Sequence, residues 1–120
     1  MLTEIQNARQ IAGEGRRRWF ADTFFDLIVW YGQEADPIGF QLCYDKQERE
    51  RALTWTREHG FQHDRVDAGE VPGHAKMTPI IVADGAFDRD SIAGRFRRES
   101  LTIDPGIASF VLERLSSYKA

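Results

Sequence analysis

Residues 25–44, FDLIVWYGQEADPIGFQLCY, decide the fold, because apolar side chains recur at every second position on both sides of a turn. A period of two is typical of strands that bury one face. Folded back as an antiparallel hairpin, the segment brings apolar side chains together in cross-strand pairs, which stabilise a sheet. The expected pairs are Tyr31 with Ile38, Val29 with Phe40, Leu27 with Leu42, and Phe25 with Tyr44.

The same period continues around this hairpin and predicts an antiparallel β-meander of about five strands. The expected strands are residues 16–20, 24–31, 38–45, 51–57 and 61–67. A turn at 21–23 would place Arg18 opposite Asp26, with Trp19 on the core face. The 47–50 loop would align Leu53 with Tyr44 and Trp55 with Leu42. We expect His59 and Gly60 to form a two-residue turn before the last of these strands.

Helical patterns are expected at both ends of the chain. The spacing of Leu2, Ile5, Ala8 and Ala12 predicts a short N-terminal helix. Residues 79–84 fit either a strand or a helix, and the Ile-Ile-Val run favours a further strand at 80–82. Two C-terminal helices follow, the first capped by Asp88 or Asp90 and the second by Asp104 with Pro105 as its first residue. Inward positions of these helices are Ile92, Phe96, Ile107, Phe110, Val111, Leu115 and Tyr118. We therefore expect an α+β domain over residues 1–120, with five or six strands and the C-terminal helices packed on one face.

Composition limits the classes of function. The chain has 120 residues, 42% hydrophobic and 29% charged, which is typical of a globular domain. A net charge of −3 argues against nucleic-acid binding. The longest apolar run, Leu27 to Tyr31, is too short for a membrane span, and the first residues lack the apolar core of a signal peptide. Cys43 is the only cysteine, so we expect no disulfide within the chain and a cytoplasmic location.

Fixing the core face also fixes the opposite face of the sheet. We expect that second face to hold a candidate ligand-binding or interface set: Asp26, Ile28, Trp30, Gln41, Cys43, Thr54, Thr56, His63 and Arg65. Apolar and hydrogen-bonding groups mixed in this way suit a ligand pocket or a homodimer interface. The third possibility is that another part of the chain covers this face.

Three chemical interpretations are compatible with these residue types. The three histidines and nearby carboxylates suggest a metal site, but His59 and His63 would lie about 13 Å apart on a continuous strand, so we expect no metal and no cofactor. Cys43 with His63 suggests a nucleophile and its base, although a small buried thiol is the commoner role of a lone cysteine. Asp26 is expected to pair with Arg18, or else to act as a base beside Cys43.

Three further segments are FQLCYD at 40–45, VDAGE at 66–70 and KMTPI at 76–80. They resemble segments of a family of small uncharacterised bacterial proteins. The resemblance implies a free-standing bacterial domain and brings no activity or catalytic residue with it.

The expected function is therefore a non-catalytic interaction module that forms a homodimer through the second face. The alternative is a small enzyme or ligand-binding protein, whose pocket would be built from Asp26, Gln41, Cys43, His63 and Arg65, with residues 67–74 as a lid. A small-molecule ligand is compatible with either interpretation.

Overall fold

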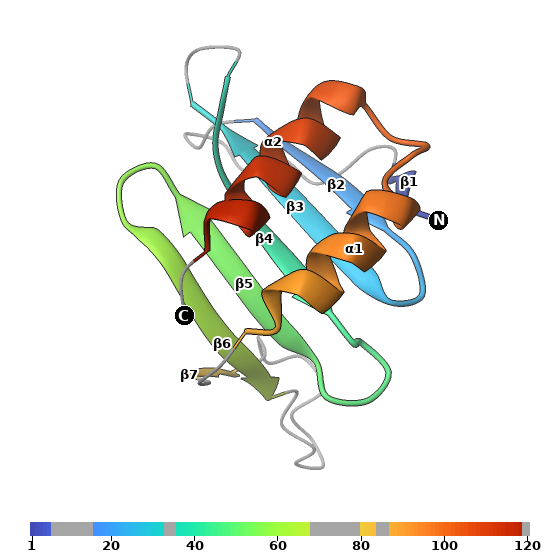
Figure 1. Ribbon diagram of the computed structural model, residues 1–120. Coiled ribbons are helices and arrows are strands. Elements are labelled where there is room, and N and C mark those ends of the chain that lie inside the picture. The colour runs from blue at the N-terminus through green and yellow to red at the C-terminus, as the bar shows by residue number, and fades with distance from the viewer. Residues whose placement is uncertain (6–15, 33–35, 68–79, 84–86, 119–120) are drawn as a thin grey trace.

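A computed structural model describes residues 1–5, 16–32, 36–67, 80–83 and 87–118. Seven strands in these ranges form one sheet in chain order, with every neighbouring pair antiparallel. They are β1 (Thr3–Glu4), β2 (Arg17–Ala21), β3 (Phe25–Tyr31), β4 (Pro37–Tyr44), β5 (Arg51–Thr56), β6 (Gly60–Asp67) and β7 (Ile80–Ala83). Helices α1 (Arg89–Glu99) and α2 (Pro105–Ser117) lie across one face of the sheet (Figure 1). The predicted α+β meander is confirmed, including the extra strand at 80–82.

The N-terminal segment begins as a strand and not as the expected helix. β1 pairs with β2, where Thr3 lies opposite Ala21. The backbone continues this pairing, because the N–H of Ile5 donates to the carbonyl of Trp19 at 2.8 Å. Sheet pairing therefore replaces the helical hydrogen bonds that the spacing of the apolar residues predicts. The remainder of the expected helix lies outside the described residues.

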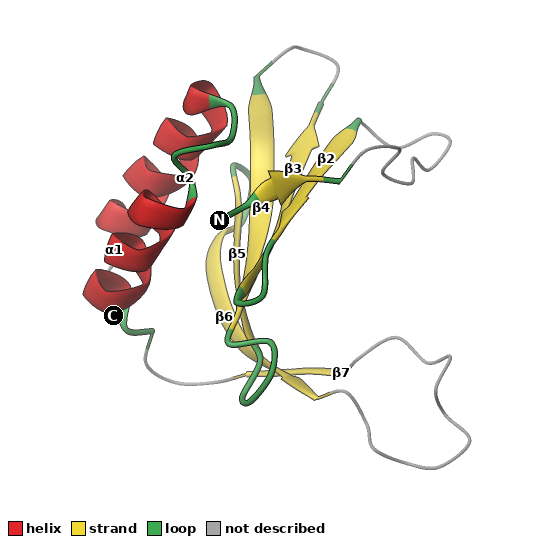
Figure 2. Cartoon of the chain, turned by 90° about the vertical axis from the view of Figure 1, so that its right-hand side faces the viewer, coloured by secondary structure: helices red, strands yellow, loops and turns green. Residues whose placement is uncertain are grey.

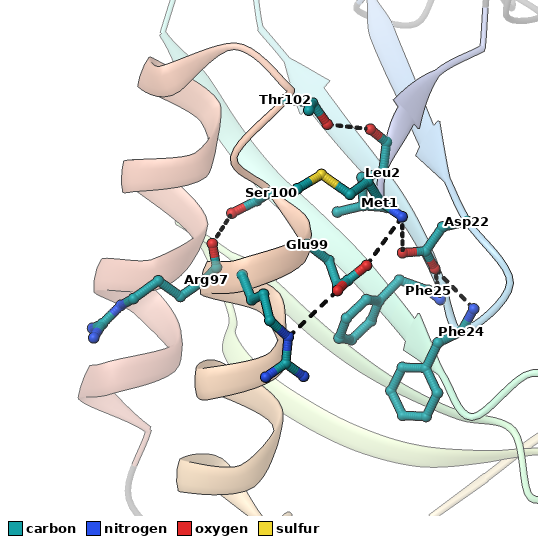
Figure 3. Close-up of polar contacts among 10 residues, drawn as sticks. Met1, Leu2, Asp22, Phe24, Phe25, Arg97, Glu99, Ser100 and Thr102 are labelled. Atoms are coloured by element: carbon teal, nitrogen blue, oxygen red, sulfur yellow. Dashed lines mark hydrogen bonds and ion pairs between the residues drawn. The ribbon is translucent and has the colours of Figure 1, made fainter.

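The first residues also join the sheet to the end of α1 (Figure 3). The N–H of Leu2 donates to the carbonyl of Glu99 at 2.9 Å, and the hydroxyl of Thr102 donates to the carbonyl of Leu2 at 2.8 Å. The Met1 amino group lies 3.0 Å from a Glu99 carboxylate oxygen and 3.9 Å from one of Asp22. The Leu2 side chain is fully buried, so this segment contributes to the core as well as to the polar contacts.

The central hairpin, residues 25–44, is confirmed for three of its four predicted pairs. Val29 lies opposite Phe40, Leu27 opposite Leu42, and Phe25 opposite Tyr44. The fourth pair differs because the register shifts after Trp30, and Tyr31 lies opposite Pro37. The next hairpin is displaced by two positions, with Leu53 opposite Leu42 and Trp55 opposite Phe40. A displacement of two keeps every side chain on its expected face.

At the turn between β2 and β3, the observed register differs from the predicted one by an odd number of positions. Asp22 closes this turn, because its Oδ1 accepts from the backbone N–H groups of Phe24 at 2.8 Å and Phe25 at 2.6 Å. Phe20 consequently lies opposite Leu27, a displacement of three from the expected register. An odd displacement reverses the faces. Phe20 is therefore fully buried in the core, and the expectation for Trp19, which is 39% exposed, was wrong.

The hairpin between β5 and β6 shows the second reversal. Thr56 lies opposite Gly60, so three residues form the loop, where two were expected. Gly60 has a φ of +74°, which glycine adopts without strain. The register again differs by three positions, and His63 lies opposite Leu53 on the face that the helices cover. The expected outward placement of His63, and of Arg65 two positions later, was therefore wrong.

Both helices pack on the core face as predicted, through Ile92, Phe96, Ile107, Val111 and Leu115. The N-cap of α1 is Asp88, one of the two expected candidates, which accepts from the N–H of Ser91. The N-cap of α2 is Asp104, as expected, which accepts from the N–H of Gly106. Aromatic contacts join the layers in both cases. Phe96 of α1 meets Phe25 edge to face at 5.8 Å between ring centroids, and Phe110 of α2 meets Phe40 at 6.0 Å.

Candidate functional site

The candidate site is the sheet face opposite the helices, which we call the open face; no described helix lies on it (Figure 2). The register arranges its outward positions in three rows that cross the strands. The Arg17 row contains Arg17, Trp30, Gly39 and Thr56. The Ile28 row contains Trp19, Ile28, Gln41, Thr54 and Gln62. The Asp26 row contains Ala21, Asp26, Cys43, Ala52 and Asp64. Alternation along each strand places these side chains together.

Seven of the nine candidate residues lie in these rows: Asp26, Ile28, Trp30, Gln41, Cys43, Thr54 and Thr56. His63 and Arg65 lie on the opposite face. Trp19 and Gln62 also belong to the open face, where the hydrophobic alternation did not predict them. The signal for Trp19 was present in Asp22, a residue type that bonds the backbone of a turn with its side chain.

His63 belongs to the core. It is 7% exposed, and its Nε2 lies 2.6 Å from the Tyr44 hydroxyl. The Tyr44 and His63 rings are stacked at 6.0 Å, and Phe87 meets the imidazole edge to face at 5.3 Å. Its Nδ1 has no hydrogen-bond partner in the described part of the chain. With the sheet between them, His63 cannot act as a base for Cys43.

Asp26 does not pair with Arg18, contrary to expectation. Lys46 is its partner, with Nζ 3.0 Å from Oδ1. Arg18 lies on the helix-covered face instead, where both its Nε and Nη2 donate to the Glu4 carboxylate, at 2.9 and 2.7 Å. Its Nη1 also donates to Asp104, the N-cap of α2, at 3.2 Å. The hydrogen bond to Glu4 raises the pKa of Arg18 and lowers that of Glu4.

The Cys43 thiol is poorly suited to nucleophilic chemistry. Burial, followed by the charges of Glu50 and Asp26, raises its pKa to about 12. Its Sγ lies 3.8 Å from Oε1 of Gln41, an uncharged side chain. Reactive cysteines are those whose thiolate is stabilised by nearby positive charge or a helix N-terminus. Cys43 therefore remains a protonated thiol at neutral pH.

We expect Cys43 to react with iodoacetamide at pH 8 far more slowly in the folded protein than in urea. A pKa of about 12 in place of 9.0 lowers the thiolate fraction about a thousandfold. The Cys43 thiol ionises at a lower pH in the unfolded chain than in the folded protein. Its contribution to the free energy of unfolding is therefore fully present below pH 9 and is lost as the pH rises toward 12. Mass spectrometry of the alkylated fraction measures the rate, and a folded rate equal to that in urea would contradict this description.

The open face also has a surface pocket of about 250 Å³ where the Arg17 row meets the β5–β6 loop. Its lining residues are Trp30, Ile38, Gly39, Thr56, Arg57, Glu58 and His59. Gly39 allows Trp30 to lie close to β4, since a Cβ there would come within 3.2 Å of the Trp30 ring. Because the pocket borders the Arg17 row, it lies at the opposite end of the face from Asp26 and Cys43, which belong to the Asp26 row.

Comparisons with known protein families, curated proteins and solved structures give no match for this chain. No group of three or more His, Cys, Asp or Glu side chains suited to a metal ion occurs within the described ranges. Neither described helix combines the length and hydrophobicity needed to cross a bilayer.

Proposed function

We propose that this protein is a non-catalytic interaction module that associates with a second copy of itself through the open face. The observation that carries this proposal is the row of Trp19 and Ile28, next to Trp30, on a sheet face with no described helix over it. Trp19 is 39% exposed, and Ile28 and Trp30 are half-buried. A grouped apolar surface with a polar surround is typical of faces that bind another protein.

The alternative function, an enzyme pocket around Asp26, Cys43, His63 and Arg65, has no geometric support. The sheet separates His63 and Arg65 from Asp26 and Cys43. The remaining groups do not form a reactive set, because Asp26 is paired with Lys46 and the Cys43 thiol has a raised pKa. Trp, by contrast, is among the residues most enriched at protein–protein contacts.

Ile28→Arg tests the proposal. We expect this variant to be monomeric, because two copies of the arginine would carry like charges into a surface that must lose its water. Ser109→Arg is the matched control, since Ser109 is exposed on α2 and far from the open face in the fold. Light scattering coupled to gel filtration measures the mass of each variant, with circular dichroism as the check of folding. Equal association of the wild type and Ile28→Arg would refute the proposed surface.

The proposal extends to location and origin. A single half-buried cysteine suits the reducing cytoplasm. We propose that it is a bacterial cytoplasmic module, and this cysteine and the resemblance of its three segments to small bacterial proteins support the proposal. Fractionation of cells that produce the protein tests the location, and recovery from an oxidising compartment would contradict it.

A further inference from the structure

The surface pocket of about 250 Å³ lies at the end of the sheet that carries the β3–β4 and β5–β6 connections (Figure 1). Two hydrogen bonds of the backbone hold the residues that line it. The N–H of Arg57 donates to the carbonyl of Ile38 at 2.9 Å, and the N–H of His59 donates to the Thr56 hydroxyl at 3.0 Å. The pocket is therefore formed by the fold itself, as most small-molecule sites are.

The lining of the pocket suits a flat ring. Trp30 and Ile38 supply its apolar side chains, and Gly39 contributes only backbone. A Cβ on Gly39 would lie 3.2 Å from the Trp30 ring and 3.1 Å from the Thr56 methyl group, so glycine is what allows the indole to lie against β4. Aromatic rings pack favourably against an indole in offset-stacked or edge-to-face arrangements.

The volume of the pocket limits the size of a ligand. Pockets for drug-sized molecules have volumes of about 300–1,000 Å³, whereas a cavity of about 150 Å³ already holds benzene. The pocket here, at about 250 Å³, lies between these two cases. One substituted ring, or two fused rings, would fill it.

The charged groups at the pocket belong to three consecutive exposed residues, Arg57, Glu58 and His59. Glu58 and His59 lie beside each other, with Oε2 3.8 Å from Nε2. The Arg57 guanidinium, by contrast, forms no hydrogen bond or ion pair with any residue that the structure describes. A guanidinium has five donors and no acceptor, and it binds a carboxylate best. The group left for a ligand is therefore the cation, and its natural partner is an anionic oxygen.

We propose that this pocket binds a small planar aromatic carboxylate, whose ring packs against Trp30 beside Gly39 and whose carboxylate accepts hydrogen bonds from Arg57. This site goes beyond the proposed self-association, because neither Trp19 nor Ile28 lines the pocket. The module would then carry a ligand at one end of the open face.

Indole-3-carboxylate is the probe for this site, and NMR titration of isotope-labelled protein measures its binding. We expect a millimolar dissociation constant, as is usual for so small a ligand at an open site. The largest shifts are expected at the amide signals of Gly39, Thr56 and His59. Two further compounds test the chemistry: cyclohexanecarboxylate has the charge without the flat ring, and indole-3-methanamine has the ring with the opposite charge. Both are expected to bind at least about threefold more weakly.

Two variants test the residues that make the site. Trp30→Leu is expected to weaken binding of indole-3-carboxylate about tenfold, because the ring loses its aromatic partner. Arg57→Gln is expected to weaken it about threefold, the size of effect typical of an exposed ion pair. Arg97→Gln is the matched control, since Arg97 is exposed on α1, on the other side of the sheet (Figure 2). Circular dichroism checks that each variant is folded.

The titration is carried out on the wild type and on Ile28→Arg, so that a second copy covering the open face cannot hide the pocket. Binding in either protein that both pocket variants weaken, and that Arg97→Gln leaves unchanged, supports the site. Absence of binding in both proteins, unchanged binding in Arg57→Gln, or tighter binding of the ammonium compound overturns it. The mass of the particle measures self-association separately, so either proposal can fail without the other.

Discussion

Phe96→Ala is expected to lower the free energy of unfolding by about 3–5 kcal/mol, the usual range for removing a large buried aromatic side chain. Phe96 is fully buried and joins α1 to the sheet through the edge of Phe25. Its loss would leave a cavity between the two layers that the rigid sheet cannot close. Urea denaturation followed by circular dichroism measures the change.

Leu101→Ala is the control for this prediction. Leu101 follows α1 in sequence but is 72% exposed, so its truncation should change the free energy of unfolding by less than about 0.5 kcal/mol. Similar midpoints for Phe96→Ala and the wild type would mean that α1 does not pack on the sheet as described.

Gly39→Ala is expected to have the second large effect, a loss of about 1–3 kcal/mol, because the added methyl group has no room. An ideal Cβ would lie 2.8 Å from the backbone oxygen of Trp55 and 3.2 Å from the Trp30 ring. The backbone oxygen cannot move without disturbing the β4–β5 pairing, so the strands must separate or Trp30 must shift. Thermal unfolding measures the loss of stability, and a change in the summed emission of the three tryptophans, Trp30 among them, reports its shift.

Gly94→Ala should have the opposite sign. Gly94 lies inside α1, and a Cβ there meets no atom within 4 Å. Alanine in a helix is favoured over glycine by about 0.5–1 kcal/mol, so this variant should be more stable than the wild type. A Gly39→Ala variant at least as stable as the wild type would contradict the close approach of Trp30 to β4, and a destabilised Gly94→Ala would contradict the open space at that position in α1.

The sequence predicted those parts of the fold in which several pairs agree on one register. The register of the central hairpin was restricted by two apolar pairs, Val29 with Phe40 and Leu27 with Leu42. Both pairs, and the faces they predict, are confirmed. The predicted register of β5 was wrong by two positions, but its faces were still correct, because a displacement of two returns Leu53 to the same face. Local capping chemistry predicted the helix start at Asp104 and narrowed the other start to Asp88 or Asp90, of which the structure has Asp88.

The errors arose at two turns whose lengths the alternation does not fix. At the β2–β3 turn, the backbone hydrogen bonds of Asp22 set the register and exchanged Trp19 with Phe20. At the β5–β6 turn, Gly60 with positive φ closes a three-residue loop and moves His63 to the core. A single odd displacement reverses a whole strand. The predicted faces were therefore correct on β3 to β5 and wrong on the two flanking strands, β2 and β6.

Sedimentation equilibrium of the wild-type protein over a wide range of concentration is the most direct test of self-association through the open face. We predict a concentration-dependent equilibrium that approaches twice the mass of the chain, and its loss in Ile28→Arg. A single species with the mass of one chain at every concentration would contradict the account.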